Sequence, residues 1–247
     1  MLNERYQAIM NILTETRKAS VHELATRLFV SEATVRRDLI EMKTMGLIER
    51  SRGHALLPDR AEEVSLFVRM NENAHEKEKA AAAALGCLPD FHSVFIDSSS
   101  TALALAQRMD LQFKTVVTNG LQTALLLSKK KDVNLILLGG GVQYNTASAT
   151  GSWTVRQMGD FSFDLMLSSC AAIAGDEVLE RTMEQREIKL ASFLRSRTRV
   201  LIADHFKFGS DGTYRLASLG DYDMVATDRK PPDALLEKNI SFVYHQE

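Results

Sequence analysis

Four segments in the C-terminal part of the chain, 97–101, 118–119, 139–141 and 204–207, combine glycine with hydroxylated and charged residues. Hydroxyl and free N–H groups at a helix start attract anions, because the helix dipole and the unpaired donors favour negative charge. Carboxylates accept hydrogen bonds from sugar hydroxyls, lysine balances phosphate, and glycine lets the backbone approach a ligand closely. The expected ligand contacts are Asp97, Ser98, Ser99, Ser100, Thr101, Thr118, Asn119, Gly139, Gly140, Gly141, Lys189 and Lys207.

A second candidate set lies in the first 57 residues. Arg36 and Arg37 are adjacent, and an arginine can donate to guanine O6 and N7 or bind a phosphate. Polar residues precede this pair, and further basic residues follow it. The expected DNA contacts are Ser31, Glu32, Ala33, Thr34, Arg36, Arg37, Arg50, Arg52 and His54.

Three helices should position the arginines. The first is indicated by apolar residues at helical spacing. Ser20 and Glu23 form a capping-box pattern that begins a second, short helix. After a break at Phe29-Val30, Ser31 can cap a third helix that runs towards Met45, before Gly46. The apolar positions of the first and third helices are Tyr6, Ile9, Met10, Leu13, Val35, Leu39 and Met42.

Two such helices across a short turn predict a helix-turn-helix, whose second helix enters the major groove of DNA by its N-terminal residues. Segment 47–57 then predicts a two-stranded wing with Gly53 at or near its turn. The alternative is a three-helix bundle with a solvated charged face. The caps, the spacing and the wing together favour DNA binding.

The rest of the chain alternates short apolar strands with helices, which predicts a mostly parallel, doubly wound α/β sheet. Ligands bind at the carboxyl ends of the strands in such sheets, where all four polar segments should meet. Each segment alone also fits a helix cap, a turn or a solvated lysine. We expect a DNA-binding domain at 1–57, a polar linker at 58–73 and a ligand-binding domain at 74–247.

The motif Ser31-Glu32-Ala33-Thr34-Val35-Arg36-Arg37-Asp38-Leu39, followed by Gly46-Leu47-Ile48-Glu49-Arg50, resembles the DeoR-type winged helix-turn-helix of bacterial sugar-catabolism regulators. The polar segments of the second domain are similar to the DeoR-family sensor domain, so the resemblance covers nearly the whole chain. It implies a fold related to ribose-5-phosphate isomerase, a phosphorylated sugar or polyol as effector, and Gly151 as a further site residue.

The chain departs from the family pattern at four places. The wing reads Arg52-Gly53-His54-Ala55 where the family usually has His-Gly-Gly-Ala. Ser99 replaces a glycine of the first loop, and Cys170-Ala171 replaces an Asp-Gly pair. Gln185 stands where the family usually has glutamate, four residues before Lys189.

The leading hypothesis is a sequence-specific transcriptional regulator that represses a carbohydrate-utilisation operon. It would bind double-stranded operator DNA as a homodimer or homotetramer and respond to a phosphorylated sugar or polyol. One alternative is a regulator whose altered sensor domain only dimerises. The other is a sugar-phosphate isomerase with Asp97 or Glu177 as base, which the missing Asp-Gly pair argues against. We expect no catalytic residues and no enzyme activity.

Composition excludes several other classes. The chain has 247 residues, of which 45% are hydrophobic and 25% charged, as in ordinary globular proteins. Residues 1–60 hold 10 basic and 8 acidic residues, and the remainder holds 20 and 24. Two cysteines are too few for a disulfide scaffold or a cysteine zinc site. No signal peptide or membrane span is expected, the histidines lack metal-ligand spacing, and we expect a cytoplasmic protein without cofactor or metal.

Overall fold

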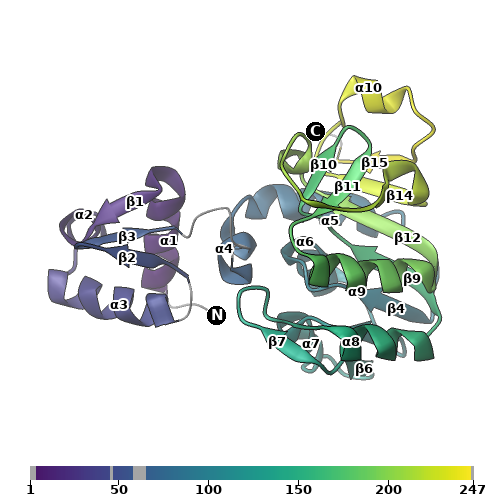
Figure 1. Cartoon of the computed structure of the whole chain (residues 1–247), viewed down its shortest axis with the longest axis horizontal. Coiled ribbons are helices and arrows are strands. Elements are labelled where there is room, and N and C mark those ends of the chain that lie inside the picture. The colour runs from purple at the N-terminus through teal and green to yellow at the C-terminus, as the bar shows by residue number, and fades with distance from the viewer. Residues whose placement is uncertain (1–3, 45–46, 58–64, 246–247) are drawn as a thin grey trace. The chain divides into compact units, whose positions relative to one another are not determined.

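The computed structural model describes residues 4–44, 47–57 and 65–245 (Figure 1). The chain forms two compact units, Met1–Glu72 and Asn73–Glu247, and each is described by itself. The expected helix end at Met45 and Gly46 lies outside the described residues. No helix of the described part is both long and apolar enough to cross a membrane.

The N-terminal unit is a winged helix-turn-helix. Its helices are α1 (Glu4–Thr16), α2 (Val21–Leu28) and α3 (Glu32–Thr44). The predicted wing is the hairpin of β2 (Glu49–Ser51) and β3 (His54–Leu56), which turns at Arg52 and Gly53, both with positive φ. The sequence did not reveal β1 (Lys18–Ser20), which pairs with β3, because three residues are too few to show alternation.

Local sequence explains these helices. Ser20 and Glu23 form the predicted capping box at the start of α2. The side chains predicted to face the core are buried on α3, namely Val35, Leu39 and Met42. These residues pack with the apolar face of α1 in one core, so the periodicity of both helices is confirmed.

The turn between α2 and α3 holds a residue in an unfavourable conformation. Phe29 has φ 55° and is 94% exposed. A side chain in the left-handed region costs roughly 1–2 kcal/mol, which glycine avoids. We expect Phe29→Gly to raise the free energy of unfolding of this unit by about 1 kcal/mol, as measured by urea denaturation of the full chain.

The control for this prediction is Ile40→Gly, at an exposed position inside α3. Glycine there should lower the free energy of unfolding by about 1 kcal/mol, because it has a low helix propensity. A loss of stability in both variants would contradict relief of strain at Phe29.

Part of the expected linker is helical. Residues 58–64 lie outside the described part, but α4 (Leu66–Asn71) follows them and belongs to the N-terminal unit. Val68 of α4 packs into the core of that unit. The apolar run Leu66-Phe67-Val68 supplies the buried face that a solvated linker would lack.

The C-terminal unit is built on a seven-stranded sheet with the order β15-β14-β12-β9-β4-β5-β6. Every adjacent pair of these strands is parallel, as predicted. The chain runs outward from β4 to β6, returns to β9 beside β4, and continues outward on the other side. Its strands are β4 (Ser93–Ile96), β5 (Thr115–Thr118), β6 (Asn134–Leu137), β9 (Phe163–Ser168), β12 (Ser196–Ala203), β14 (Met224–Thr227) and β15 (Phe242–Tyr244).

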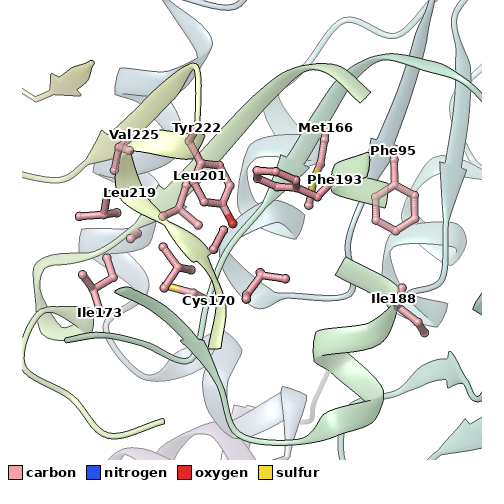
Figure 2. Close-up of a cluster of buried hydrophobic side chains, with 14 of the residues drawn as sticks. Phe95, Met166, Cys170, Ile173, Ile188, Phe193, Leu201, Leu219, Tyr222 and Val225 are labelled. Carbon is pink, nitrogen blue, oxygen red and sulfur yellow. The ribbon is translucent and has the colours of Figure 1, made fainter. Parts of the chain in front are cut away.

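Helices cover both faces of this sheet (Figure 1). On one face, α5 (Ala74–Leu85) and α6 (Ser100–Arg108) bury alanine and leucine side chains against Val94 and Ile96. On the other face, α9 (Met183–Leu194) contributes to a cluster around Phe95 and Met166, shown in Figure 2. Alternate residues of β4 thus point to opposite cores, as a doubly wound sheet requires. The remaining helices are α7 (Leu121–Leu127), α8 (Ser152–Gln157) and α10 (Asp233–Leu236).

Two small antiparallel sheets were not predicted. One has the order β10-β11-β13, and the other is a hairpin of β7 and β8. These strands are short and rich in glycine, alanine and polar residues, so their sequences show little strand alternation. Their bounds are β7 (Gly141–Gln143), β8 (Ser148–Thr150), β10 (Ala172–Ala174), β11 (Glu177–Glu180) and β13 (Tyr214–Ser218).

Candidate functional site

The N-terminal end of α3 presents the predicted DNA-reading residues. Ser31 caps the helix by accepting from the N–H of Thr34 at 3.2 Å. Arg36 is ion-paired with Glu32 at 2.8 Å, whereas Arg37 is exposed and makes no ion pair among the described residues. Ala33, the residue after Glu32, is also exposed. Arg37 is therefore the residue of this set best able to reach a base or a phosphate.

Two contacts hold α3 against α1. Arg5 donates to the buried carboxylate of Asp38, with Nη2 at 2.8 Å from Oδ1. The hydroxyl of Tyr6 donates to Glu41, and this hydrogen bond raises the pKa of Tyr6 to about 12. These contacts fix the angle at which α3 presents its first turn. Asp38 was seen in the motif, but its spacing from Arg5 gives no sign of this pairing.

The wing residues lie on a tight hairpin. Arg52 is exposed at the turn and Arg50 is half-buried on β2. His54 places its Nδ1 atom 3.2 Å from the carbonyl oxygen of Arg52. The wing therefore carries two arginines and a histidine within one short hairpin, a charge arrangement suited to a phosphate backbone.

At the carboxyl edge of the parallel sheet, Asp97 follows β4 at the point where the strand order reverses. It is 1% exposed. Its Oδ1 atom accepts from the N–H of Ser99 at 2.9 Å and from the hydroxyl of the same residue. Its Oδ2 atom accepts from Ser168 Oγ at 2.9 Å and from the N–H of Ser169 at 3.1 Å. The carboxylate thus ties the first polar loop to the end of β9.

Lys189 completes a buried charge cluster with Asp97. Its Nζ atom lies 2.6 Å from Glu180 Oε1, 2.7 Å from the carbonyl oxygen of Ser169 and 3.3 Å from Asp97 Oδ2. Burial alone would lower the pKa of Lys189, but the carboxylates of Glu180 and Asp97 outweigh it and raise the pKa above the ordinary value. Lys189 therefore stays charged, and its donors are used within the protein.

Several polar atoms at the same edge are buried without a hydrogen-bond partner in the described structure. They come from different strand ends: Asn119 follows β5, Ser169 follows β9 and Asp204 follows β12. Because an unpaired buried polar group costs roughly 1–3 kcal/mol, such atoms are expected where a ligand binds. The atoms are Asn119 Oδ1, Ser169 Oγ and Asp204 Oδ2. The hydroxyl of Tyr222, which precedes β14, is also buried without a partner in the core beneath this edge.

Cys170 lies among the charged groups of this edge. Burial raises the pKa of its thiol to about 12, and the charges of Lys207, Glu180, Lys189 and Asp204 also act on it. Lys207 is half-buried and makes no ion pair among the described residues. Lys207 follows β12 at the same edge of the sheet and is a cation that is still open to an anionic ligand.

Burial also raises the pKa of Tyr222 well above its ordinary value, with smaller contributions from Cys170, Glu180 and Asp97. Its hydroxyl points into the cluster that contains Cys170 (Figure 2). Sequence reasoning missed Tyr222, Ser169 and Glu180 as site residues. Nothing in their spacing signals the site, because β9, β11 and the turn before β14 come together only in the fold.

The glycines of the predicted site have structural roles. A Cβ on Gly140, where φ is +156°, would lie 2.0 Å from Thr154 Oγ1. The carbonyl oxygen of Gly139 accepts from Thr154 Oγ1 at 2.9 Å and from Gln157 Nε2 at 2.8 Å. Glycine at position 140 therefore permits close packing against α8, and the Gly139 carbonyl is already engaged.

The other predicted residues lie at the start of α6, at the end of β5 and before α8. Ser98 Oγ donates to Gln185 Oε1 at 3.3 Å, and Gln185 Nε2 donates to Ser148 Oγ at 3.0 Å. The hydroxyl of Thr118 accepts from the N–H of Gly120. Ser99 caps α6, whose first residues are Ser100 and Thr101. Gly151 has φ +96° and precedes α8.

A separate cavity of about 390 Å³ lies at the ends of β12 and β14. The imidazole of His205 lines it, held by Asp228 Oδ2 at 2.7 Å from Nδ1. Arg229 and Lys230 line the same cavity, and Lys230 is paired with Asp233 at 2.7 Å. Among the described residues, no group of histidine, cysteine, aspartate or glutamate side chains is arranged to hold a metal ion.

Comparison with solved structures finds partial overlap with a sugar-phosphate enzyme. The match to ribose 5-phosphate isomerase A from Neisseria gonorrhoeae covers 54% of this chain and 53% of the isomerase chain, with 15% identity and a TM-score of 0.38. Ribose 5-phosphate isomerase from Plasmodium falciparum covers 55% and 53%, with 14% identity and a TM-score of 0.39.

Comparison with curated proteins finds relatives along almost the whole chain. The transcriptional regulator GolR of Listeria innocua is 32% identical over 95% of this chain and 94% of its own. The repressor GlcR of Bacillus subtilis is 29% identical over 96% and 93%. The glycerol-3-phosphate regulon repressor of Escherichia coli is 29% identical over 95% and 94%.

Two family models divide the chain between them. The DeoR-like helix-turn-helix domain matches residues 5–61, and the DeoR C-terminal sensor domain matches residues 72–229. Together with the winged helix-turn-helix and the site at the edge of the parallel sheet, these matches show that the chain belongs to the DeoR family of DNA-binding transcriptional regulators.

Proposed function

We propose that this regulator represses a carbohydrate-utilisation operon and that a phosphorylated sugar or polyol, bound at the carboxyl edge of the sheet, changes its affinity for the operator. One relative is named for the regulon of a phosphorylated polyol. The proposed DNA-reading set is the one named from the sequence, with Arg37 as its main contact. Two subunits would place their α3 helices in successive major grooves, about 10–10.5 bp apart or multiples of that.

The observation that carries the effector proposal is the set of unpaired buried atoms at the carboxyl edge of the sheet, where Lys207 also follows β12. Asn119 Oδ1 and Asp204 Oδ2 are acceptors without a donor, and Ser169 Oγ can donate or accept. A ligand with several hydroxyl groups supplies those donors. Lys207 supplies a positive charge for a phosphate. Asp97 and Lys189, whose hydrogen bonds are internal, hold the frame of the site.

Lys207→Ala tests this assignment. Fluorescence anisotropy at fixed salt would follow binding to DNA from upstream of the protein's own operon, with and without sn-glycerol 3-phosphate, glucose 6-phosphate and ribose 5-phosphate. One phosphorylated compound should shift the wild-type affinity about 5–150-fold, and its unphosphorylated parent should not. Lys207→Ala should bind the DNA with wild-type affinity but lose the shift.

The matched control is Lys129→Ala, which removes an exposed lysine after α7. It should keep both DNA binding and the effector response. An effector response that persists in Lys207→Ala would exclude Lys207 as the anchor of the phosphate.

A sensor domain that only dimerises is the second candidate. Ser99 stands where the family usually has glycine, and its hydroxyl donates a hydrogen bond to Asp97 Oδ1. This oxygen of the Asp97 carboxylate is therefore already engaged within the protein. If the DNA is bound tightly and no phosphorylated compound shifts the affinity, this second candidate is favoured.

Two observations support regulation without catalysis. Asp97 is fully hydrogen-bonded within the protein, and Glu177 is an exposed residue paired with Arg215 at 2.9 Å. These contacts argue against either carboxylate as the base of an isomerase, which must lie within hydrogen-bond reach of the proton it removes. Isomerase assays on pentose and hexose phosphates should show no activity.

A further inference from the structure

The β7–β8 hairpin covers part of the proposed ligand site. The N–H of Ala149 donates to the carbonyl oxygen of Asn119 at 2.8 Å, and Asn119 Nδ2 donates back to the carbonyl oxygen of Ala149 at 3.1 Å. The N–H of Leu121 donates to the carbonyl oxygen of Ala147 at 2.9 Å. Asn119, which carries one of the unpaired atoms, is therefore held under β8.

A ligand cannot reach Asn119 Oδ1 unless something moves, because Asn119 is only 1% exposed. The hairpin pairs with no strand of the seven-stranded sheet, and its outer strand exposes Val142. The buried strand β8 is held by its contacts with 119–121, including a bridge from Ser148 to Gly120, so movement requires these contacts to open.

Glycines flank the hairpin on both sides. Gly140 has φ +156°, and Gly151 has φ +96° with ψ 176°, a combination that only glycine adopts without strain. Gly140 is packed against Thr154 of α8, whereas Gly151 has open space around it, so a change of chain direction is expected at Gly151, on the β8 side of the hairpin.

Gln185 connects this hairpin to the first polar loop. The amide oxygen of Gln185 accepts from Ser98, and its amide nitrogen donates to Ser148 on β8. Gln185 is 4% exposed and lies on α9, one turn before Lys189. An amide can make both contacts at once, because it carries a donor and an acceptor, whereas a glutamate carboxylate offers acceptors only.

We propose that the β7–β8 hairpin is a lid over the ligand site and that the Gln185 side chain, by linking Ser98 to Ser148, sets how firmly the lid closes. That the covered site binds an effector rests on the proposed function. The movement itself belongs to the ligand-free protein and can be tested without a ligand.

Hydrogen–deuterium exchange of the ligand-free full chain tests the lid. In Gln185→Ala and Ser148→Ala, peptides spanning 141–150 should exchange about five times faster than in the wild type, the effect of losing one hydrogen bond. Peptides from β4 and β9 should keep wild-type rates. Equal acceleration everywhere, or no change at 141–150, would overturn the proposal.

Glycine substitutions give an independent measurement that leaves Gln185 intact. Gly151→Ala has open space for its Cβ but a strained φ, so it should also accelerate exchange at 141–150 about five-fold or more. The matched control is Gly175→Ala, which has φ +60° and open space but lies in the β10–β11 turn. Wild-type exchange at 141–150 in Gly151→Ala would contradict a hinge there.

The single tryptophan separates failure of the lid from failure of the effector proposal. Trp153 is 61% exposed and lies two residues after Gly151. Titration with sn-glycerol 3-phosphate, glucose 6-phosphate and ribose 5-phosphate should change its fluorescence with one compound, and Gln185→Ala should alter the apparent Kd for that compound. Accelerated exchange in the variants without any fluorescence response would support the lid and contradict the effector.

Discussion

Replacing Lys189 by methionine is expected to lower the free energy of unfolding of the C-terminal unit by about 3–5 kcal/mol. The substitution leaves two buried carboxylates, Asp97 and Glu180, without their shared cation. Removing one partner of a buried ion pair lowers the free energy of unfolding far more than removing one partner of a surface pair. The remaining charge is then buried without a counterion and without water. Urea denaturation of the full chain, followed by circular dichroism, measures the change.

The control is Arg215→Met, which breaks the exposed pair with Glu177 at 2.9 Å. This variant should lower the free energy of unfolding by less than about 1 kcal/mol. Since the pKa of Lys189 is raised in the folded state, its stabilising contribution is complete below the unfolded pKa and disappears only as the pH rises through the folded pKa. The wild type should therefore keep this contribution from neutral pH up to the ordinary lysine value of 10.5. Equal losses in both variants would contradict a buried cluster.

Arg37→Ala is expected to weaken operator binding about 5–150-fold, corresponding to about 1–3 kcal/mol for an arginine–guanine contact. Arg37 lies near the N-terminal end of α3 and, unlike Arg36, has no internal carboxylate partner among the described residues. Anisotropy titrations on operator and unrelated DNA, each at several salt concentrations, measure the effect. A contact to a base should reduce discrimination between the two DNAs, whereas a contact to a phosphate should reduce the salt slope by about 1.

The control is Lys43→Ala, which removes one positive charge from the last turn of the same helix. It should change affinity little, because the recognition helix reads DNA through its N-terminal residues. Similar losses in both variants would indicate a general charge effect, and the prediction that Arg37 reads the operator would be wrong.

The sequence was informative wherever structure depends on neighbouring residues. The capping box at Ser20 and Glu23, the periodic face of α3 and the alternation of strands and helices are local patterns, and each was confirmed. The polar loops could be placed at one edge of the sheet because parallel strands share the direction of their carboxyl ends.

The partners of individual side chains were not predictable. Asp97 and Lys189 were predicted as ligand contacts, but nothing in the sequence indicated that Lys189 would pair with both Asp97 and Glu180. A residue type shows what a group can bind but not which group will occupy it. The family departure at Gln185 was visible in the sequence, but its contacts with Ser98 and Ser148 join segments that are distant in the chain.

The position of β9 in the middle of the sheet also has a consequence for synthesis. Val94 of β4 pairs with Leu165 of β9, about 70 residues later in the chain. At a synthesis rate of roughly 5–20 residues per second, β9 is made roughly 4–14 s after β4. One edge of β4 has no strand partner during this time. That edge is apolar, and an uncovered apolar edge invites pairing with other chains. The N-terminal unit ends at Glu72, so it can fold before this interval, during which we expect the nascent sensor domain to be most open to wrong strand pairing.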